Sequence, residues 1–180
     1  MRTVKRYLDA SGKHPAEWAG HWSASLSAPR LAAECCLTSK DYTQLEGHLH
    51  RVEQNSNQHL LAWVMRAKLA HARVVLPDDV DEKVVTGGSR VVYSVGVLPG
   101  ESRMLVHWDD NPLFGDRLRV ATLLGATLLG MRAGQEAPLF RPDGSTGRLF
   151  VRDVPFQPEA VKRQLRRTIE EEDGEGHEQG

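Results

Sequence analysis

The sequence predicts an α+β protein in which an N-terminal helical hairpin precedes a small sheet with one short helix. Apolar residues recur at helical spacing from 38 to 75, and beyond residue 83 the spacing changes to strand-like alternation. Between the two patterns, Leu76–Glu82 contains Pro77 and four carboxylates, a composition typical of a solvated linker. The 180 residues have room for one ordinary domain or two small ones.

Residues 1–37 are expected to form a poorly ordered or partly helical extension. Trp18, Trp22 and Leu26 have helical spacing, but Pro15 and Pro29 confine any helix to a few turns. We interpret this segment as a loosely attached extension, with a docking arm for a partner as the alternative.

Two apolar stripes predict the helical hairpin over 38–76. Thr38 and Asp41 have the spacing of an N-cap and its reciprocal acid, so the first helix should begin there. The first stripe consists of Tyr42, Leu45, Leu49 and Val52, and the second of Leu61, Met65, Leu69 and Ala72. Because the connection is short, the helices should be antiparallel neighbours, a short coiled coil whose tip is residues 53–58.

The second half, 83–160, has the pattern of a small antiparallel sheet. The expected elements are strands at 91–95, 104–108, 118–120, 137–141 and 148–154, with a short buried helix at 122–130. Residues 98–101 and 142–144 supply turns. From residue 161 the chain is polar and ends in an acidic run, so we expect a frayed or disordered tail over 161–180.

The composition excludes several classes of protein. Lys and Arg number 23 against 24 Asp and Glu, so no overall field attracts nucleic acid, and any such association should be indirect. The longest uncharged apolar stretch, Val120–Met131, is too short to span a membrane, and residues 1–22 form no secretory signal. The adjacent Cys35 and Cys36 suit reduced thiols. A soluble cytoplasmic protein is expected.

Candidate chemical sites mostly have simpler explanations. Gly125 and Gly130 have the spacing of a phosphate loop, but Met131 and Arg132 follow where that motif needs Lys and Ser or Thr, so we favour tight helix packing. Asp109 and Asp110 could ligate magnesium, although neighbouring side chains in a strand or loop point apart.

The hairpin has four histidines but no clear metal site. On a helix His48 and His50 point about 200° apart, and His71 is about three turns from His59, so we expect exposed histidines. Ser89 and Ser145 lack an identifiable His and acid, and nucleophilic catalysis is not expected. The sequence therefore predicts no cofactor, no metal and no small-molecule substrate.

Four segments, Val85–Val91, Thr122–Glu136, Phe156–Ala160 and Leu69–Val75, together resemble a known family, the GreA/GreB transcription elongation factors and the regulator of nucleoside diphosphate kinase, Rnk. Val85–Val91 resembles the opening strand of their shared C-terminal domain, and Thr122–Glu136 resembles its glycine- and leucine-rich block. Phe156–Ala160 and Leu69–Val75 are similar to segments of the Rnk branch.

The resemblance implies an FKBP-like antiparallel sheet that binds the rim of the RNA polymerase secondary channel, with the hairpin directed into the channel. In cleavage-promoting members, acidic residues at the tip reach the catalytic magnesium of the polymerase. Here the tip residues Glu53, Gln54, Asn55, Ser56 and Asn57 include one carboxylate. We therefore expect a non-enzymatic factor that modulates elongation or competes with cleavage factors without supplying catalytic acids.

The expected rim contacts are Asp109, Asp110, Asn111, Pro112, Thr122, Leu123 and Leu124, which align with an exposed loop and a helix start in the family. Two alternatives stay open. The layout of the sheet and helix also serves peptidyl-prolyl isomerases, which would need an apolar, aromatic-lined pocket. Direct regulation of nucleoside diphosphate kinase follows from the family name alone.

Overall fold

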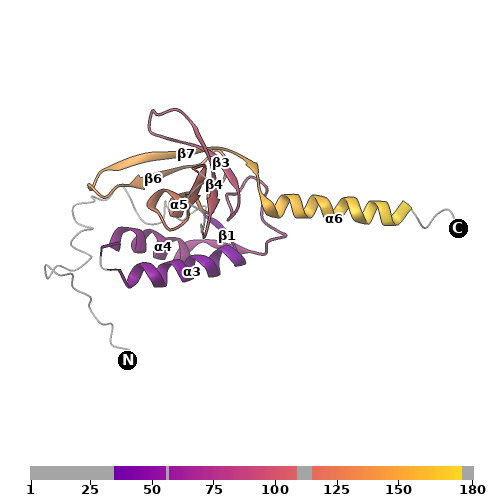
Figure 1. Cartoon of the computed structure of the whole chain (residues 1–180), viewed down its shortest axis with the longest axis horizontal. Coiled ribbons are helices and arrows are strands. Elements are labelled where there is room, and N and C mark those ends of the chain that lie inside the picture. The colour runs from indigo at the N-terminus through magenta and orange to yellow at the C-terminus, as the bar shows by residue number, and fades with distance from the viewer. Residues whose placement is uncertain (1–34, 56, 109–114, 176–180) are drawn as a thin grey trace, which may run out of the picture.

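The computed structural model describes residues 35–55, 57–108 and 115–175, which form a mixed α+β fold (Figure 1). The elements are β1 (Cys36–Thr38), α3 (Ser39–Glu53), α4 (His59–His71), β2 (Arg73–Val75), β3 (Arg90–Val95), β4 (Glu101–Val106), β5 (Arg117–Arg119), α5 (Leu123–Leu128), β6 (Glu136–Phe140), β7 (Thr146–Phe156) and α6 (Pro158–Glu175). None of the helices in these ranges is both long enough and apolar enough to cross a bilayer.

The main sheet has five strands in the order β5-β4-β3-β7-β6. Its pairs β3–β4, β3–β7 and β6–β7 are antiparallel, as the sequence predicts. The pair β4–β5 is parallel, so the prediction of an antiparallel sheet is wrong for this edge. The connection between these strands runs from 107 to 116, longer than a tight hairpin turn, and it lets the chain re-enter the sheet in the same direction.

The helices α3 and α4 occupy the ranges that the two apolar stripes predict. The side chain of Thr38 accepts a hydrogen bond from the backbone N–H of Asp41 at 3.0 Å, which fixes the start of α3. The helices are joined by a short connection and lie side by side in Figure 1. Their flanking strands β1 and β2 pair in parallel, so a small ribbon closes the base of the helix pair.

The N-terminal extension was expected to run to residue 37, but the pairing of β1 with β2 places residues 36 and 37 in the folded body. Cys36 lies in β1, and Leu37 is fully buried in the core. Cys35 and Cys36 are both buried free thiols. Three-residue strands have no alternating pattern long enough to be recognised in a sequence, which is why the ribbon was not expected. Residues 1–34 lie outside the described part of the chain.

One hydrophobic core joins the helix pair to the sheet. Leu45 of α3 and Met65 of α4 are fully buried in the same cluster as Val91 of β3, Leu128 of α5 and Leu149 of β7. The resemblance implies a hairpin that is directed away from the sheet into a channel, and this shared core contradicts that expectation. The helices lie against the sheet and α5 instead (Figure 1).

The composition of α4 explains this packing. Leu61, Ala62, Val64, Met65 and Ala67 are all buried, and they surround most of the helix instead of forming one stripe. A helix that is apolar on most sides must be covered on most sides, and one partner helix cannot do that. The edge of the Trp63 ring also meets Phe140 of β6, with 5.3 Å between the ring centroids.

The C-terminal residues also differ from expectation. Residues 161–175 continue α6, which begins at Pro158 and extends away from the body in Figure 1. Proline is favoured at the first position of a helix, and Val161, Leu165 and Ile169 recur every four residues. Residues 176–180 lie outside the described ranges.

Candidate functional site

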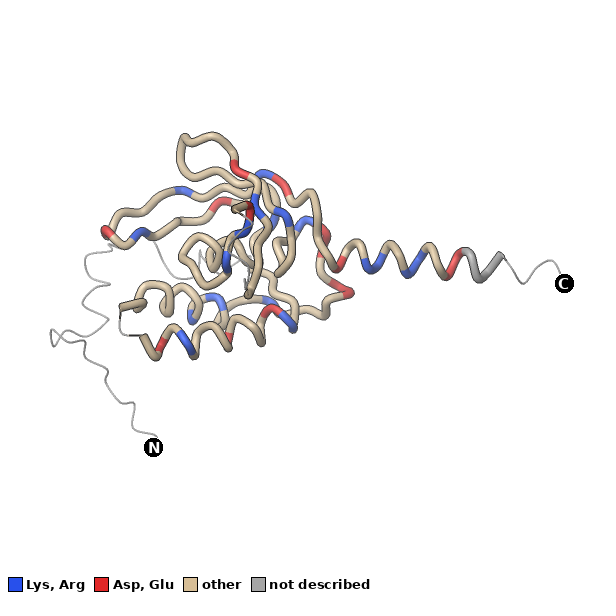
Figure 2. The backbone as a smooth tube through the Cα atoms, in the orientation of Figure 1, with Lys and Arg blue, Asp and Glu red and all other residues tan. Residues whose placement is uncertain are grey.

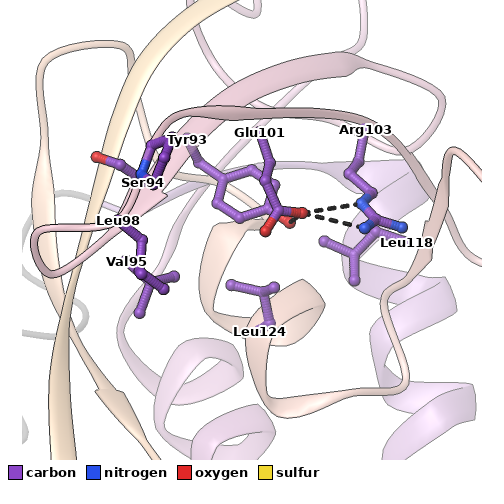
Figure 3. Close-up of a pocket in the computed structure, with 9 residues that line it drawn as sticks. Tyr93, Ser94, Val95, Leu98, Glu101, Arg103, Leu118 and Leu124 are labelled. Carbon is purple, nitrogen blue, oxygen red and sulfur yellow. Dashed lines mark hydrogen bonds and ion pairs between the residues drawn. The ribbon is translucent and has the colours of Figure 1, made fainter.

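A pocket of about 400 Å³ opens where the β3–β4 hairpin meets β5 and the start of α5 (Figure 3). Its lining comes from four elements and the hairpin turn. The lining residues are Tyr93, Ser94, Val95, Leu98, Pro99, Glu101, Arg103, Leu118 and Leu124.

A hydrogen-bonded row of three side chains forms the polar side of the pocket. Tyr93 and Glu101 are directly opposite each other on β3 and β4, and Arg103 follows on the same face of β4 two residues later. The Tyr93 hydroxyl donates to Glu101 Oε2 at 3.2 Å, and Arg103 donates to the same oxygen from Nε and Nη2 at 3.2 and 3.0 Å. Figure 3 shows the row.

The electrostatics of this row keep Tyr93 neutral. Burial raises the pKa of its hydroxyl above the ordinary value, and the adjacent Glu101 carboxylate raises it further. Arg103 also donates to the Gly115 carbonyl at 2.8 Å, which ties the row to the start of the β5 segment. Tyr93 and Arg103 are therefore two fixed donors that share the Glu101 carboxylate as acceptor, at the edge of an apolar pocket.

The apolar side of the pocket depends on the start of α5. The Thr122 side chain accepts from Gly125 N–H at 3.0 Å and donates to the Arg119 carbonyl at 2.8 Å, which fixes the first turn and places Leu124 in the lining. Gly125 is required because a Cβ there would collide with the Arg119 carbonyl. The packing explanation of Gly125 is therefore right, and the phosphate-loop explanation is not needed.

The hairpin turn beside the pocket is apolar and exposed. Val97 is fully exposed and Leu98 is 59% exposed, although hairpin turns are usually polar. Together with Leu118 and Leu124 in the pocket, they form what we call the hairpin face. Exposed apolar side chains gathered beside a depression mark interaction surfaces more often than isolated ones do.

A buried polar cluster lies where α3 meets the end of β4. His107 Nε2 donates to Asp41 Oδ1 at 2.8 Å, and the same oxygen accepts from Gly87 N–H at 3.1 Å. His48 stacks on His107 with 5.4 Å between centroids and lies 4.1 Å from the Trp108 ring. This arrangement can fasten the helix pair to the sheet.

His48 corrects the expectation of four exposed histidines. It is 2% exposed, whereas His50, His59 and His71 are exposed as expected. Burial lowers the pKa of His48 to about 4, with further contributions from His107 and Arg51. Its position three residues after Leu45, on the apolar stripe, is the sequence signal for this burial. Within the described ranges, no three or more His, Cys, Asp or Glu residues are grouped so that they could hold a metal ion.

Lys68 is a second buried group that sequence reasoning missed. It is 1% exposed, and its ammonium donates to the carbonyls of Thr127, at 2.7 Å, and Leu129. Both carbonyls belong to the C-terminal end of α5, where a cation is favourable. Burial nevertheless lowers the pKa of this lysine. Lys68 therefore joins α4 to α5.

Comparison with known proteins gives the family. The chain is 32% identical over 103 residues to the regulator of nucleoside diphosphate kinase of Escherichia coli K12, covering 56% of this chain and 75% of that protein. The protein of the same name from Shigella flexneri matches equally well. The chain belongs to this family of GreA/GreB-like regulators. No family model matches it.

A solved structure gives the same result. The transcription elongation factor GreA/GreB from Nitrosomonas europaea aligns with a TM-score of 0.51 and 28% identity, over 68% of this chain and 99% of that one. The GreA/GreB-like fold therefore includes most of the described residues.

The rim contacts expected from the resemblance are partly described. Asp109, Asp110, Asn111 and Pro112 lie outside the described residues. Thr122 caps α5, Leu123 and Leu124 are half-buried, and Leu124 lines the pocket. The resemblance thus led to Leu124 of the hairpin face but not to the turn residues Val97 and Leu98. The only sequence signal for these two is that a hairpin turn is unusually apolar there.

The expected tip residues are not part of the pocket. Arg66 of α4 donates to Glu53 Oε1 from Nε and Nη2, at 2.9 and 2.6 Å. Gln54, Asn55 and Asn57 are exposed, and Ser56 lies outside the described residues. The single carboxylate of the tip is therefore held by an arginine.

Proposed function

We propose that this protein regulates transcription by binding RNA polymerase through the hairpin face. The observation that supports the proposal most directly is the exposed apolar turn, Val97 and Leu98, beside an apolar pocket in a GreA/GreB-like fold. A folded protein loses little by exposing two such side chains, but a partner that covers them gains roughly 1.5–3 kcal/mol for each. The hairpin turn is thus suited to lie within an interface.

We propose that the contact is at the rim of the secondary channel, the position that the GreA/GreB resemblance implies for this fold. The helix pair does not enter the channel in this proposal, because α3 and α4 share the core of the sheet. The protein acts by occupying the rim and excluding factors that need the same position. It supplies no catalytic acid, since Glu53 is paired with Arg66 and no second carboxylate adjoins it in the sequence.

A binding experiment with core RNA polymerase tests the proposal. The double substitution Val97→Asp and Leu98→Asp should weaken binding by more than about tenfold, because two charges would enter an apolar contact. Leu76→Asp is the matched control, since Leu76 is also exposed and lies outside the hairpin face. The control should bind like the parent chain. A cleavage factor added in excess should displace the parent chain from the polymerase.

The outcomes separate the parts of the proposal. A parent chain without affinity for core polymerase removes the function. Unchanged affinity of the double variant removes the hairpin face but not the partner. Stimulation of transcript cleavage by the parent chain would contradict the absence of a catalytic acid.

The pocket does not favour the isomerase alternative. Among the described residues of its lining, Tyr93 is the only aromatic side chain, whereas an isomerase site was expected to be apolar and aromatic-lined. A peptide isomerisation assay should show no turnover. Regulation of nucleoside diphosphate kinase is the function in the name of the Escherichia coli relative, and adding the purified chain to that kinase tests it directly.

A further inference from the structure

Cys35 and Lys68 form a buried pair of nucleophilic groups that the proposed function does not use. The Lys68 ammonium donates to Cys35 Sγ at 3.8 Å, and the two residues are 33 apart in the chain. Cys35 is 5% exposed and Lys68 is 1% exposed. Figure 2 marks the Lys and Arg positions, and of the two in α4, Arg66 is exposed whereas Lys68 is buried. The pair therefore joins the residue before β1 to the last turn of α4, away from solvent.

The sulfur of Cys35 is enclosed on the side of α5. Its thiol donates to the Leu129 carbonyl at 3.8 Å, the same carbonyl that accepts from Lys68. A Cβ on Gly130 would lie 2.6 Å from Sγ, so the backbone can approach the sulfur this closely only because residue 130 is glycine. Among the described residues, Lys68 is the side chain that hydrogen-bonds to this sulfur, and the shared carbonyl holds both groups in place.

The neighbouring thiol, Cys36, has a different environment and serves as an internal comparison. Cys36 Sγ accepts from Arg73 Nη2 at 3.9 Å, and a guanidinium does not lose its proton in proteins, so it is not a nucleophile. Cys35 belongs to the main core, whereas Cys36 belongs to a separate small cluster with Val80 and Val84. The two side chains therefore point to opposite sides, as neighbours along an extended chain do, and a disulfide between them is not favoured.

Lys68 can supply a neutral amine more readily than an exposed lysine. Burial lowers the pKa of its side chain below the ordinary value, although the sulfur of Cys35 acts in the opposite direction. An unprotonated amine has a free electron pair and can attack an electrophilic sulfur. An oxidised cysteine contains such a sulfur, because a sulfenic acid condenses with a nearby thiol or nitrogen. Oxidation of Cys35 therefore places an electrophile beside an amine.

We propose that Cys35 and Lys68 are a redox modification site, at which hydrogen peroxide generates a covalent bond between the Cys35 sulfur and the Lys68 nitrogen. In the first step the thiol sulfur attacks peroxide, an S–O bond forms as the O–O bond breaks, and the thiol proton leaves with the released oxygen as water. In the second step the Lys68 nitrogen, after the ammonium has released one proton to solvent, attacks this sulfur. The S–O bond breaks, and the departing hydroxide takes a proton from the nitrogen. Sulfur loses two electrons overall, and one peroxide becomes two molecules of water.

Burial slows this reaction but directs its outcome. Hydrogen peroxide is small and uncharged, and the ribbon beside the site consists of two three-residue strands, which can open locally. Further oxidation to a sulfinic acid needs a second peroxide at the same enclosed sulfur, whereas the amine is already in contact with it. Lys68 should therefore trap the sulfenic acid before it is oxidised again.

The new bond fastens the base of the helix pair. It closes a loop of 33 residues that contains α3 and most of α4. A cross-link across a loop restricts the unfolded chain and thereby stabilises the fold. The bond is also reversible, because two thiol molecules restore the cysteine and the lysine and become one disulfide. The site thus makes the attachment of α4 to β1 depend on peroxide.

The first experiment treats the purified full chain with hydrogen peroxide and measures its mass without reductant. The linked chain should be about 2 Da lighter than the parent, since two hydrogens are lost, and dithiothreitol should restore the original mass. Trypsin does not cleave after a modified lysine, so residues 67–73 should remain intact and joined to residues 31–40. Alkylation should find Cys36 free in that product. A Cys35 that stays a thiol, or that gains about 32 Da as a sulfinic acid, overturns the proposal.

Two matched variants separate this bond from a disulfide, which would cause the same loss of mass. Cys35→Ser and Cys36→Ser each replace a buried free thiol by a hydroxyl, so they are equally conservative. Cys35→Ser should not lose the two hydrogens, whereas Cys36→Ser should form the link to the same extent as the parent chain. A Cys36→Ser chain that no longer loses them would indicate a disulfide between the two cysteines and overturn the proposal.

The last measurement is the melting temperature. The linked chain should melt roughly 5–10 °C above the reduced chain, because its loop stays closed on unfolding. Equal melting temperatures of the two forms would overturn the fastening role. These readouts do not involve RNA polymerase, so they are independent of the proposed function.

Discussion

Asp41 of α3 and His107, which directly follows β4, are joined by a hydrogen bond of 2.8 Å that links the helix pair to the sheet. Both side chains are almost fully excluded from water, with exposed fractions of 3% and 6%. Asp41 also accepts from the Gly87 amide and the Thr38 hydroxyl. At residue 87 only glycine fits, because a Cβ would collide with both Asp41 and His107.

Replacing Asp41 should therefore destabilise the whole fold. We expect Asp41→Ala to lower the free energy of unfolding by about 3 kcal/mol, since the His107, Gly87 and Thr38 donors lose one shared acceptor. Urea denaturation followed by circular dichroism measures the change. Glu46→Ala, at an exposed position of the same helix, is the control and should stay within about 0.5 kcal/mol of the parent. A loss below about 1 kcal/mol for Asp41→Ala would contradict the linking role.

His48 should make stability fall in mild acid. Its folded pKa of about 4 is below the ordinary value of 6.5, so between these pH values the unfolded chain binds more protons than the folded one. The contribution is complete above pH 6.5, decreases as the pH falls toward 4, and amounts to about 3 kcal/mol at most. His48→Phe keeps an aromatic ring against His107 and Trp108 but cannot titrate.

The measurement for His48 is the free energy of unfolding between pH 7 and 4 in both chains. Other groups titrate over this range in both proteins, so the difference between the two curves isolates His48. The variant should have the shallower slope. Parallel curves would show that the protonation of His48 does not differ between the folded and unfolded states.

Lys68 should be more important for stability than an exposed lysine. Lys68→Met fills a similar volume but leaves the carbonyls of Thr127 and Leu129 without their donor, and we expect a loss of about 2–4 kcal/mol. Lys40→Met, at an exposed position of α3, is the control and should be nearly neutral. A stable Lys68→Met chain would mean that α4 and α5 are held together by apolar contacts alone.

The periodicity of the sequence predicted α3, α4, α5 and the strands of the main sheet, because each of them repeats a pattern over several residues. It did not predict α6, β1 or β2. It did not predict what the helices pack against. A stripe such as that of α3 shows that one face is covered, and either α4 or the sheet could cover it. The necessary signal was in α4, where Ala62, Val64 and Ala67 extend the apolar surface beyond the stripe through Leu61 and Met65.

The candidate site was less accessible to sequence reasoning. The pocket is assembled from β3, β4, β5 and α5, and no local pattern shows that Tyr93 and Leu118 will line the same depression. Asp41 was recognised as a capping acid, but its second partner, His107, is 66 residues away in the chain. Such contacts depend on the register of the sheet, which periodicity alone does not determine.

The shared core leads to a final prediction about how the helix pair moves. Val64 and Met65 of α4 are fully buried in the same cluster as Val91 and Leu149 of the sheet, so the helices should open only when the whole fold unfolds. In native-state hydrogen exchange, the most protected amides of α4 should have the same opening free energy as those of β3 and β7. Exchange of α6 should be much faster, because its body contacts lie near its start. The contrary result is an opening free energy of α3 and α4 that is several kcal/mol below the free energy of global unfolding. The pair could then detach without unfolding the sheet, and entry into a narrow channel would again be a workable mechanism.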